Sequence, residues 1–200
     1  MTLVMGMDVG FRKTGITIFD IGGERDELIH AETVQSDNLE MVRKLDSDMS
    51  SVFSLLVAFD KILAEKCIHA VFAESPEGGS RGARASHCMG MAKALLAGFL
   101  HYNPEIEFEI FSPGQVEVAL GIKLTPGEAK KLGMKKGERA KWKKERLRTC
   151  VLTEWPDFKG WPKAKAIAED SYDSAAAFLC ARTAGEIYRK LKEKECKIKR

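Results

Sequence analysis

The chain has 200 residues, of which 44% are hydrophobic and 30% charged, and its formal net charge is +3. This length fits one globular domain with a sizeable core, so we expect a single domain over residues 1–200. No apolar run approaches the roughly 20 residues of a membrane helix. The first residues show no secretory signal, and we expect a protein that is not secreted. The five cysteines form no CxxC pair, which argues against a disulfide framework or a zinc site.

Positive charge is concentrated in one part of the chain. Residues 123–148, the basic segment, contain eleven Lys or Arg and only three acids, for a net charge of +8. A basic segment on an otherwise acidic chain indicates a polyanionic partner such as nucleic acid. A solvated surface helix with ordinary lysines explains the same composition, and charge alone does not separate the two interpretations.

The N-terminal third predicts three consecutive strands. Residues 3–8 form a short apolar run that ends in an acid, and residues 15–19 and 27–34 follow with strand-like composition. Glycine-containing turns join these runs closely. Strands joined by such short turns pair antiparallel, so we expect an antiparallel meander.

Helices and strands alternate from residue 50 onward. Residues 50–66 carry one apolar stripe at helical spacing, and a strand over 70–73 follows it. A helix over 83–99, a strand over 106–111 and a short helix over 113–120 come next. The order predicts an α/β fold with a mixed five-stranded sheet, three antiparallel strands and then parallel ones, flanked by helices.

The C-terminal part predicts more helix than strand. We expect a mobile or partly helical loop over 125–137, a helix over 137–154, an irregular stretch over 156–162 and a final helix over 169–193. The basic segment therefore forms a loop and helix insertion in the single domain.

Acids at the ends of buried strands are the informative feature of this chain. Asp8 ends the first predicted strand and Glu74 ends the fourth, so both could lie at one end of the same sheet. An isolated ionised carboxylate beside a core is costly to desolvate. Asp170 and Asp173 are three residues apart and share one helix face near the predicted helix start. Helix capping is the competing explanation for this second pair.

Four converging carboxylates would repel one another strongly unless cations lay between them. Hard oxygen ligands suit Mg²⁺, and Mn²⁺ in its place. Two such ions about 3.5–4 Å apart can hold a phosphodiester. The sequence therefore predicts a metal-dependent nuclease whose catalytic and metal-binding residues are the same four carboxylates: Asp8, Glu74, Asp170 and Asp173.

Three motifs carry a resemblance to a known family. G-M-D-V-G at 6–10 with T-G at 14–15, A-E at 73–74 and D-S-Y-D-S-A-A at 170–176 resemble the motifs of the RuvC-like Holliday junction resolvases. These belong to the ribonuclease H-like superfamily, and the order and spacing agree over nearly the whole chain. The resemblance implies a ribonuclease H-like fold and an endonuclease with two Mg²⁺ ions per site. It also implies a homodimer that resolves four-way DNA junctions by paired nicks.

The sequence departs from the resembled family at three places. The loop at 75–82 has no aromatic residue, whereas the bacterial enzymes carry a Phe there that is thought to insert at the junction centre. Glu117 stands where the bacterial family tends to have a basic residue, and the lysine-rich stretch at 123–144 is longer than the usual connection. These differences indicate a divergent, viral or organellar member. We expect it in the cytoplasm of a bacterial or virus-infected cell, or in an organellar matrix.

The resemblance also bears on self-association, and charge predicts the DNA contacts. The helix over 85–100 is rich in small residues that permit a close approach, and in the resembled family this helix forms much of the dimer interface. The resemblance therefore implies that it does so here, although packing on the sheet explains the same composition. No membrane partner is expected. The residues predicted to contact DNA are Lys13, Arg81, Arg84, Lys130, Lys131, Lys135, Lys136, Lys143 and Lys144.

Other functions remain open at this point. A ribonuclease H-like nuclease with another specificity, such as RNA processing, would show the same carboxylates. A non-catalytic nucleic-acid-binding protein on this fold is disfavoured by the intact set of four acids. An actin-like ATPase needs two lobes, for which 200 residues are too few.

Overall fold

The computed structural model describes residues 1–36, 44–77, 82–135 and 137–198. A five-stranded sheet with the order β3-β2-β1-β4-β5 forms its centre. The strands β1 (Leu3–Val9), β2 (Lys13–Asp20) and β3 (Glu27–Gln35) form an antiparallel meander. The strands β4 (Ala70–Glu74) and β5 (Glu107–Phe111) continue the sheet parallel to β1. The predicted mixed sheet is thereby confirmed.

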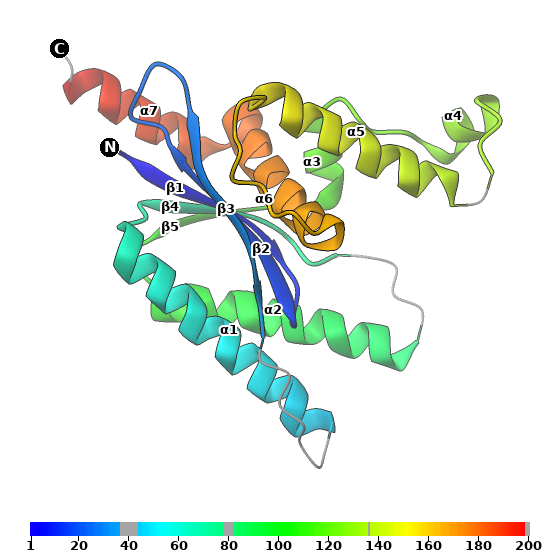
Figure 1. The fold of residues 1–200 in the computed structure, drawn as a ribbon, viewed down its shortest axis with the longest axis horizontal. Helices are drawn as coiled ribbons and strands as arrows, with labels where there is room; N and C mark the ends of the chain where they lie inside the picture. The colour runs from blue at the N-terminus through cyan, green and yellow to red at the C-terminus, as the bar shows by residue number, and fades with distance from the viewer. Residues whose placement is uncertain (37–43, 78–81, 136, 199–200) are drawn as a thin grey trace.

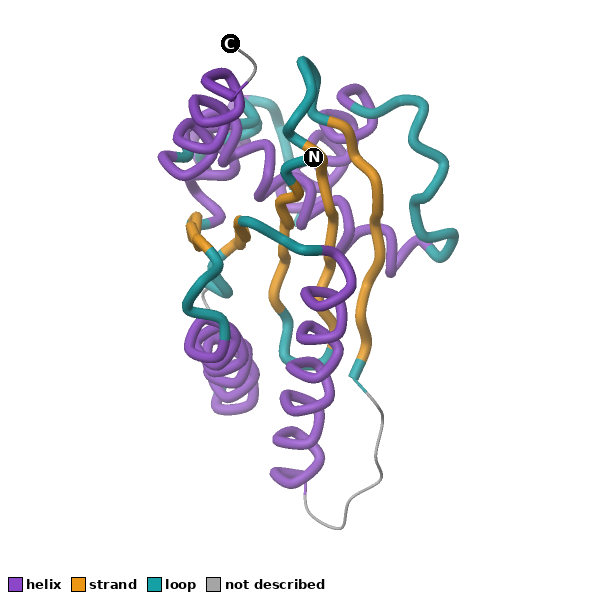
Figure 2. The backbone as a smooth tube through the Cα atoms, turned by 90° about the vertical axis from the view of Figure 1, so that its left-hand side faces the viewer, coloured by secondary structure: helices purple, strands orange, loops and turns teal. Residues whose placement is uncertain are grey.

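Helices cover both faces of this sheet (Figure 1). One face is covered by α1 (Lys44–Lys66) and α2 (Ala83–Tyr102), which Figure 2 shows from the side. The long helix α6 (Lys165–Ala184) lies across the other face, beside α5 (Glu138–Glu154). None of the helices in the described part of the chain is long and apolar enough to cross a membrane.

Three shorter helices complete the structure. They are α3 (Pro113–Ala119), α4 (Pro126–Lys131) and α7 (Glu186–Ile198). The Thr125 side chain caps α4 in a capping box with Glu128, which explains the helix in the stretch expected to be a mobile or partly helical loop. Together, α4 and α5 form an arm that extends to one side of the molecule (Figure 1).

The alternation of side chains along β1 decides which residues face which helix layer. Met5 and Met7 pack into the core beneath α1 and α2. Val4 packs into the core beneath α6, and the backbone of Gly6 faces the Ser174 carbonyl of α6. Successive side chains of a strand point to opposite faces. Asp8 therefore shares the α6 face with Val4 and Gly6.

The contact between α6 and the sheet is unusually close because the facing residues are small. A Cβ on Gly6 would lie 2.3 Å from the carbonyl oxygen of Ser174. The Ser174 hydroxyl donates a hydrogen bond to Thr17 Oγ1 at 3.2 Å, and Thr33 Oγ1 donates to the Ile167 carbonyl at 2.8 Å. These buried hydroxyl contacts fix the position of α6 along the strands.

The C-terminal helix differs from the prediction in both its start and its length. We expected one helix over 169–193, but α6 begins at Lys165 and ends at Ala184, and α7 begins at Glu186. Gly185 between them has an extended backbone, with φ −71° and ψ 137°, which breaks the helix. The earlier start matters for the site because it moves Asp170 and Asp173 away from the helix N-terminus.

Candidate active site

Asp8 and Glu74 are neighbours on adjacent parallel strands. They are register partners where β1 and β4 run side by side, and both are partly buried. Residues paired in register on neighbouring strands point to the same face, so Glu74 shares the α6 face with Asp8. The sheet therefore brings together two carboxylates that are 66 positions apart in the sequence.

Helix α6 carries the other two carboxylates to the same place. Gly15 is the register partner of Asp8 on β2, and its backbone faces the carbonyl oxygen of Asp170. Asp170 is thus held beside the end of β1, and Asp173 follows it by about one helical turn. Helix capping does not explain either acid, because α6 begins at Lys165 and its N-cap, Ala164, has no side-chain cap.

Burial and mutual repulsion raise the pKa values of three carboxylates in this site. Burial, with the charges of Asp173 and Asp170, raises the pKa of Asp8 to about 7. Burial, with the charge of Asp8 and other acids, raises the pKa of Glu74 to about 8. Burial also raises the pKa of Asp173 to about 6, against the opposing charge of Lys144. Such grouped shifts are typical of functional sites.

Two lysines partly balance this charge. Lys13 Nζ lies 2.7 Å and 3.0 Å from the two carboxylate oxygens of Asp170. Lys144 Nζ lies 3.3 Å from Glu169 Oε2. Burial lowers the pKa of Lys144, but the charges of Asp173, Glu169 and Asp170 outweigh it and raise that pKa.

The donor set fits hard divalent cations by its chemistry. Carboxylate oxygens are the ligands that Mg²⁺ and Mn²⁺ prefer, and a cation would relieve the charge that raises these pKa values. Within the described residues, however, no three or more His, Cys, Asp or Glu side chains lie in an arrangement that could already hold a metal ion. The ligand role of the four acids therefore remains a prediction.

A further acid near the site was not predicted to belong to it. Glu117 on α3 forms an ion pair with Lys143 of α5, and its charge contributes to the raised pKa of Glu74. In the sequence, Glu117 is visible only as an acid where the resembled family has a basic residue. Its place near the site depends on the packing of α3 against α6 and β5, which no local pattern indicates.

Arg84 occupies a structural position at the start of α2. It forms two hydrogen bonds to the carboxylate of Asp48 on α1, at 2.5 Å and 3.0 Å. Arg12 and His87 bind the same carboxylate, so that Asp48 is only 1% exposed. The Arg84 guanidinium holds the pKa of Asp48 well below its usual range. This cluster ties the β1–β2 turn and the first turn of α2 to α1.

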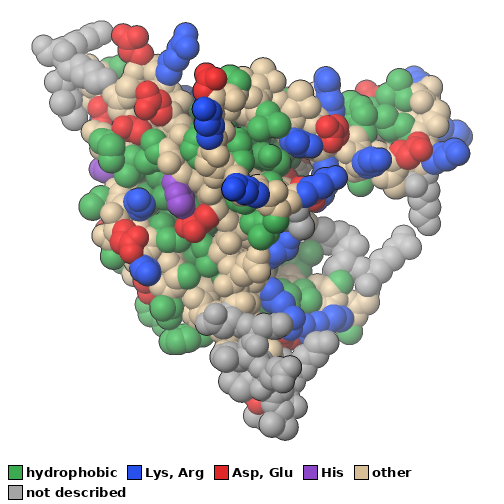
Figure 3. All heavy atoms as spheres, in the orientation of Figure 1, with side chains coloured by type: hydrophobic (Ala, Val, Ile, Leu, Met, Phe, Trp, Pro, Cys, Tyr) green, Lys and Arg blue, Asp and Glu red, His purple; other side chains and the backbone are tan. Residues whose placement is uncertain are grey.

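The residues predicted to contact DNA, apart from Lys13 and Arg84 described above, fall into three groups. Lys130, Lys131 and Lys135 lie exposed on or beside α4, while Lys143 and Lys144 are ion-paired on α5. Arg81 and Lys136 lie outside the described residues. Figure 3 shows Lys and Arg side chains over the α4–α5 arm, at the rim of a hollow between this arm and the rest of the molecule.

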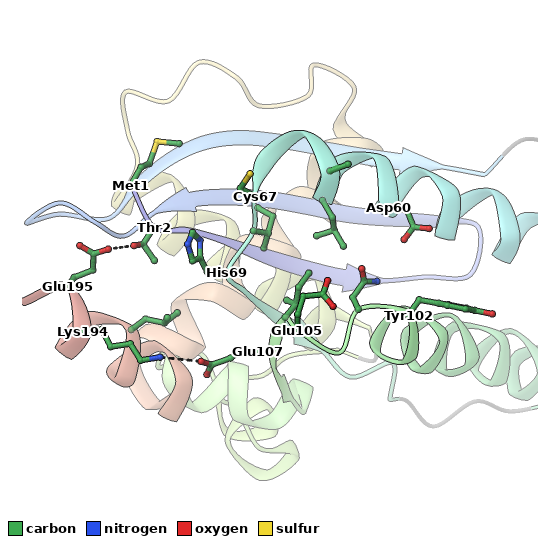
Figure 4. A pocket seen from close by; sticks show the side chains of 16 residues that line it. Met1, Thr2, Asp60, Cys67, His69, Tyr102, Glu105, Glu107, Lys194 and Glu195 are labelled. Carbon is green, nitrogen blue, oxygen red and sulfur yellow. Dashed lines mark hydrogen bonds and ion pairs between the residues drawn. The ribbon is translucent and has the colours of Figure 1, made fainter. Parts of the chain in front are cut away.

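A cavity at the opposite end of the sheet lies apart from the four carboxylates. It has a volume of about 1050 Å³ and is lined by residues at the starts of β1, β4 and β5 (Figure 4). Several of its polar groups pair with one another: the Thr2 hydroxyl binds Glu195, and Lys194 lies 3.6 Å from Glu107. These pairings are typical of a structural contact between α7 and the sheet.

Comparisons with known proteins identify the fold. No family model and no curated protein sequence matches the chain. Thermus thermophilus RuvC in complex with a Holliday junction substrate is similar in structure over 94% of this chain and 97% of that chain, with a TM-score of 0.65 and 16% identity. A second Thermus thermophilus RuvC structure gives the same coverage and identity with a TM-score of 0.63.

A more distant structural similarity involves the yeast mitochondrial Holliday junction resolvase Ydc2. It covers 96% of this chain and 83% of that chain at 16% identity, with a TM-score of 0.48 that is too low to add to the assignment. The similarity to the two RuvC structures spans nearly the whole chain and agrees with the motifs around Asp8, Glu74 and Asp170. The chain therefore has the ribonuclease H-like fold of RuvC.

Proposed function

We propose that this protein is a Mg²⁺-dependent, structure-selective endonuclease that resolves four-way DNA junctions by paired nicks. The observation that supports it most is the grouping of Asp8, Glu74 and Asp173, all with raised pKa values, on the fold of RuvC. One of the similar RuvC structures contains a Holliday junction substrate. Because that similarity concerns the fold, the argument for activity rests on the residues of this chain.

In this proposal Asp8, Glu74, Asp170 and Asp173 hold two divalent ions. The ions would supply Lewis-acid stabilisation of the negative charge that develops at the scissile phosphate. The Gly6 and Gly15 contacts support the ligand role because they bring the backbone of α6 against β1 and β2. A rigid backbone holds side-chain ligands within the small tolerance that such chemistry needs.

Lysines of this chain would bind the DNA backbone. The exposed Lys130 and Lys131 on α4 carry no ion pair among the described contacts that would compete with a phosphate. Lys13 and Lys144 lie beside the carboxylates. Lys13 could bind a phosphate oxygen once a metal ion neutralises its partner Asp170, and Lys144 could do so by exchanging its exposed pair with Glu169 for the phosphate. Phosphate contacts of this kind position a nucleic acid without reading its sequence.

A symmetric homodimer would present two such sites to the two equivalent strands of a junction. Exposed apolar side chains on α1 support it: Met49 is 60% exposed, Phe53 69% and Val57 53%. They recur every four residues and form one stripe. On the neighbouring helix α2, Gly90, Ala94 and Ala97 are exposed and would allow a close approach.

Cleavage assays with defined substrates test the proposed function. The protein with Mg²⁺ is incubated with a four-way junction, with a linear duplex of the same sequence and with structured RNA. We expect symmetric nicks in two opposed junction strands and little cleavage of the other substrates. Preferential cleavage of RNA would identify a processing nuclease, and binding without any cleavage would identify a non-catalytic protein. Either result would overturn the proposal.

A further inference from the structure

A second cavity adjoins the carboxylate site. It has a volume of about 480 Å³, lies between α5 and the segment 162–173, and includes Asp173 and Lys144 in its lining. These two residues also belong to the candidate active site, so the cavity opens beside the place where a scissile phosphate would lie. Its volume falls in the range of about 300–1,000 Å³ that is typical of ligand pockets.

The inner walls of this cavity are apolar and aromatic. Leu147, Pro162 and Ala168 line it together with Tyr172. The Tyr172 ring packs against Trp161 at a centroid distance of 4.8 Å, and the Arg148 guanidinium lies over it at 5.9 Å. Aromatic rings and guanidinium planes are the surfaces on which nucleobases stack.

The mouth of the cavity is basic. Lys141, Lys163 and Lys165 line it and are exposed. Such flexible cations suit the phosphates of a nucleic-acid backbone. The carboxylates of Glu145 and Glu169 also line the cavity and can accept hydrogen bonds from the amino groups of a base.

This combination selects one class of ligand. A lone phosphate would use the lysines but gain nothing from the apolar walls. An apolar molecule would leave the lysines and carboxylates unused. A nucleotide uses both parts, with its base against the apolar lining and the Arg148 guanidinium and its phosphate toward the lysines.

We propose that this cavity, hereafter the α5–α6 pocket, receives one unpaired nucleotide of the substrate strand next to the cleaved phosphate. The proposal rests on the proposed nuclease function and adds a step to it: the nucleotide leaves the base stack before the strand is cut. Removing a base from a stack costs least where pairing is already disrupted. The pocket therefore favours branched over fully paired DNA.

A base-unstacking assay tests the α5–α6 pocket separately from cleavage. The protein in EDTA binds four-way junctions in which 2-aminopurine replaces one base at a time around the cut site. Leu147→Trp fills the pocket, and Arg148→Gln removes the guanidinium over Tyr172. Arg146→Gln is the matched control, because Arg146 lies on the same helix over Trp142 and does not line the pocket. Circular dichroism verifies that each variant is folded.

We expect 2-aminopurine fluorescence to change at a single position beside the cut with the wild type and with Arg146→Gln. The change should be absent with Leu147→Trp and reduced with Arg148→Gln. With Mg²⁺, Leu147→Trp should cut the intact junction about 10-fold more slowly or worse. An abasic site at the responding position should restore its rate, because no base then has to enter the pocket.

Failures of the two proposals give different results. If Leu147→Trp cuts every substrate at the wild-type rate and the fluorescence pattern is unchanged, the α5–α6 pocket proposal is wrong and the nuclease proposal stands. If no junction is cut, a titration with the four deoxynucleoside monophosphates, followed by tryptophan fluorescence, still tests the pocket. Saturable binding that Leu147→Trp removes would support a nucleotide pocket but overturn its assignment to a substrate strand. Absence of binding would overturn the pocket as well.

Discussion

The backbone of Gly15 lies directly against the carbonyl of Asp170: a Cβ on Gly15 would be 1.9 Å from that oxygen. This separation is far below any real contact, so only glycine allows α6 to lie this close to β2. Gly15 is also the register partner of Asp8. One glycine therefore sets how closely the carboxylates of the helix approach those of the sheet.

Gly15→Ala should displace α6 from the sheet and separate the carboxylates. We expect a loss of unfolding free energy of about 1–3 kcal/mol, typical of overpacking, and a loss of most Mg²⁺-dependent cleavage. Thermal denaturation and cleavage rates measure the two effects. Gly127→Ala is the control, because a Cβ there meets no atom within 4 Å. Normal cleavage by a folded Gly15→Ala protein would show that the close approach is dispensable.

Single substitutions of the four carboxylates should separate cleavage from binding. Asp8→Asn, Glu74→Gln, Asp170→Asn and Asp173→Asn should each slow cleavage by about 100-fold or more, because each removes an oxygen ligand of the proposed ions. Junction affinity should persist, since it depends on the lysines. Gel-shift and cleavage assays give both values. Near-normal rates in two or more variants would show that the active-site assignment is wrong.

The stability of the metal-free protein should fall as the pH rises. In the folded state Asp8, Glu74 and Asp173 keep protons up to a pKa of about 7, 8 and 6. In the unfolded chain these groups lose their protons near pH 4. Between about pH 4 and pH 8 the folded state binds more protons, so the stability present below pH 4 is lost as the pH rises.

We expect this loss of unfolding free energy to amount to several kcal/mol between pH 5 and pH 8 in EDTA. Mg²⁺ should raise the melting temperature more at pH 8 than at pH 5, since the acids bind metal when deprotonated. The Asp8→Asn, Glu74→Gln double variant is the control, with a flatter pH profile and higher stability at pH 8. Identical profiles of stability against pH for the wild type and the double variant would show that Asp8 and Glu74 do not cause the predicted loss of stability.

The exposed lysines of α4 should contribute to affinity through counterion release. Lys130→Glu with Lys131→Glu should weaken junction binding for all sequences and reduce the salt dependence by about one unit of slope per lost phosphate contact. Lys190→Glu on α7, at the far end of the molecule, is the control. An unchanged salt slope in the α4 variant would leave this surface without a role in binding.

The dimer should depend on outward-facing residues of α1 and α2. Phe53→Glu and Ala94→Glu should yield a folded monomer, because a charge in an apolar interface is costly to desolvate. Light scattering at micromolar concentration measures this. Leu96 and Gly98 are unsuitable for the test: Leu96 is buried, and a Cβ on Gly98 would meet Leu56 of α1. A wild-type monomer that cuts both strands in one binding event would overturn the dimer.

The sequence by itself determined the order of the elements and the candidate acids. Alternation and apolar runs are local signals, so they located the strands that carry Asp8 and Glu74 at or next to their last residue. Motifs are also local, which is why residues 170–176 could be recognised without knowing where their helix begins. The helix start at Lys165 was missed because Ala164 before it offers no capping side chain. The break at Gly185 was missed because a single glycine within a helical pattern is a weak stop signal.

Only the tertiary structure decided which acidic and basic side chains form ion pairs. The guanidinium of Arg84 binds Asp48, an acid on another helix, and the DNA contact expected for Arg84 stays a prediction. Lys13 pairs with Asp170, and Lys143 pairs with Glu117, across separations that no sequence window spans. Ion pairs and pKa shifts depend on distance and burial, which follow from how the helices pack on the sheet and on one another. For the four carboxylates, the contacts of α6 with Gly6 and Gly15 set these distances. The sequence therefore identifies the charged residues, while the fold determines which of them form ion pairs with one another.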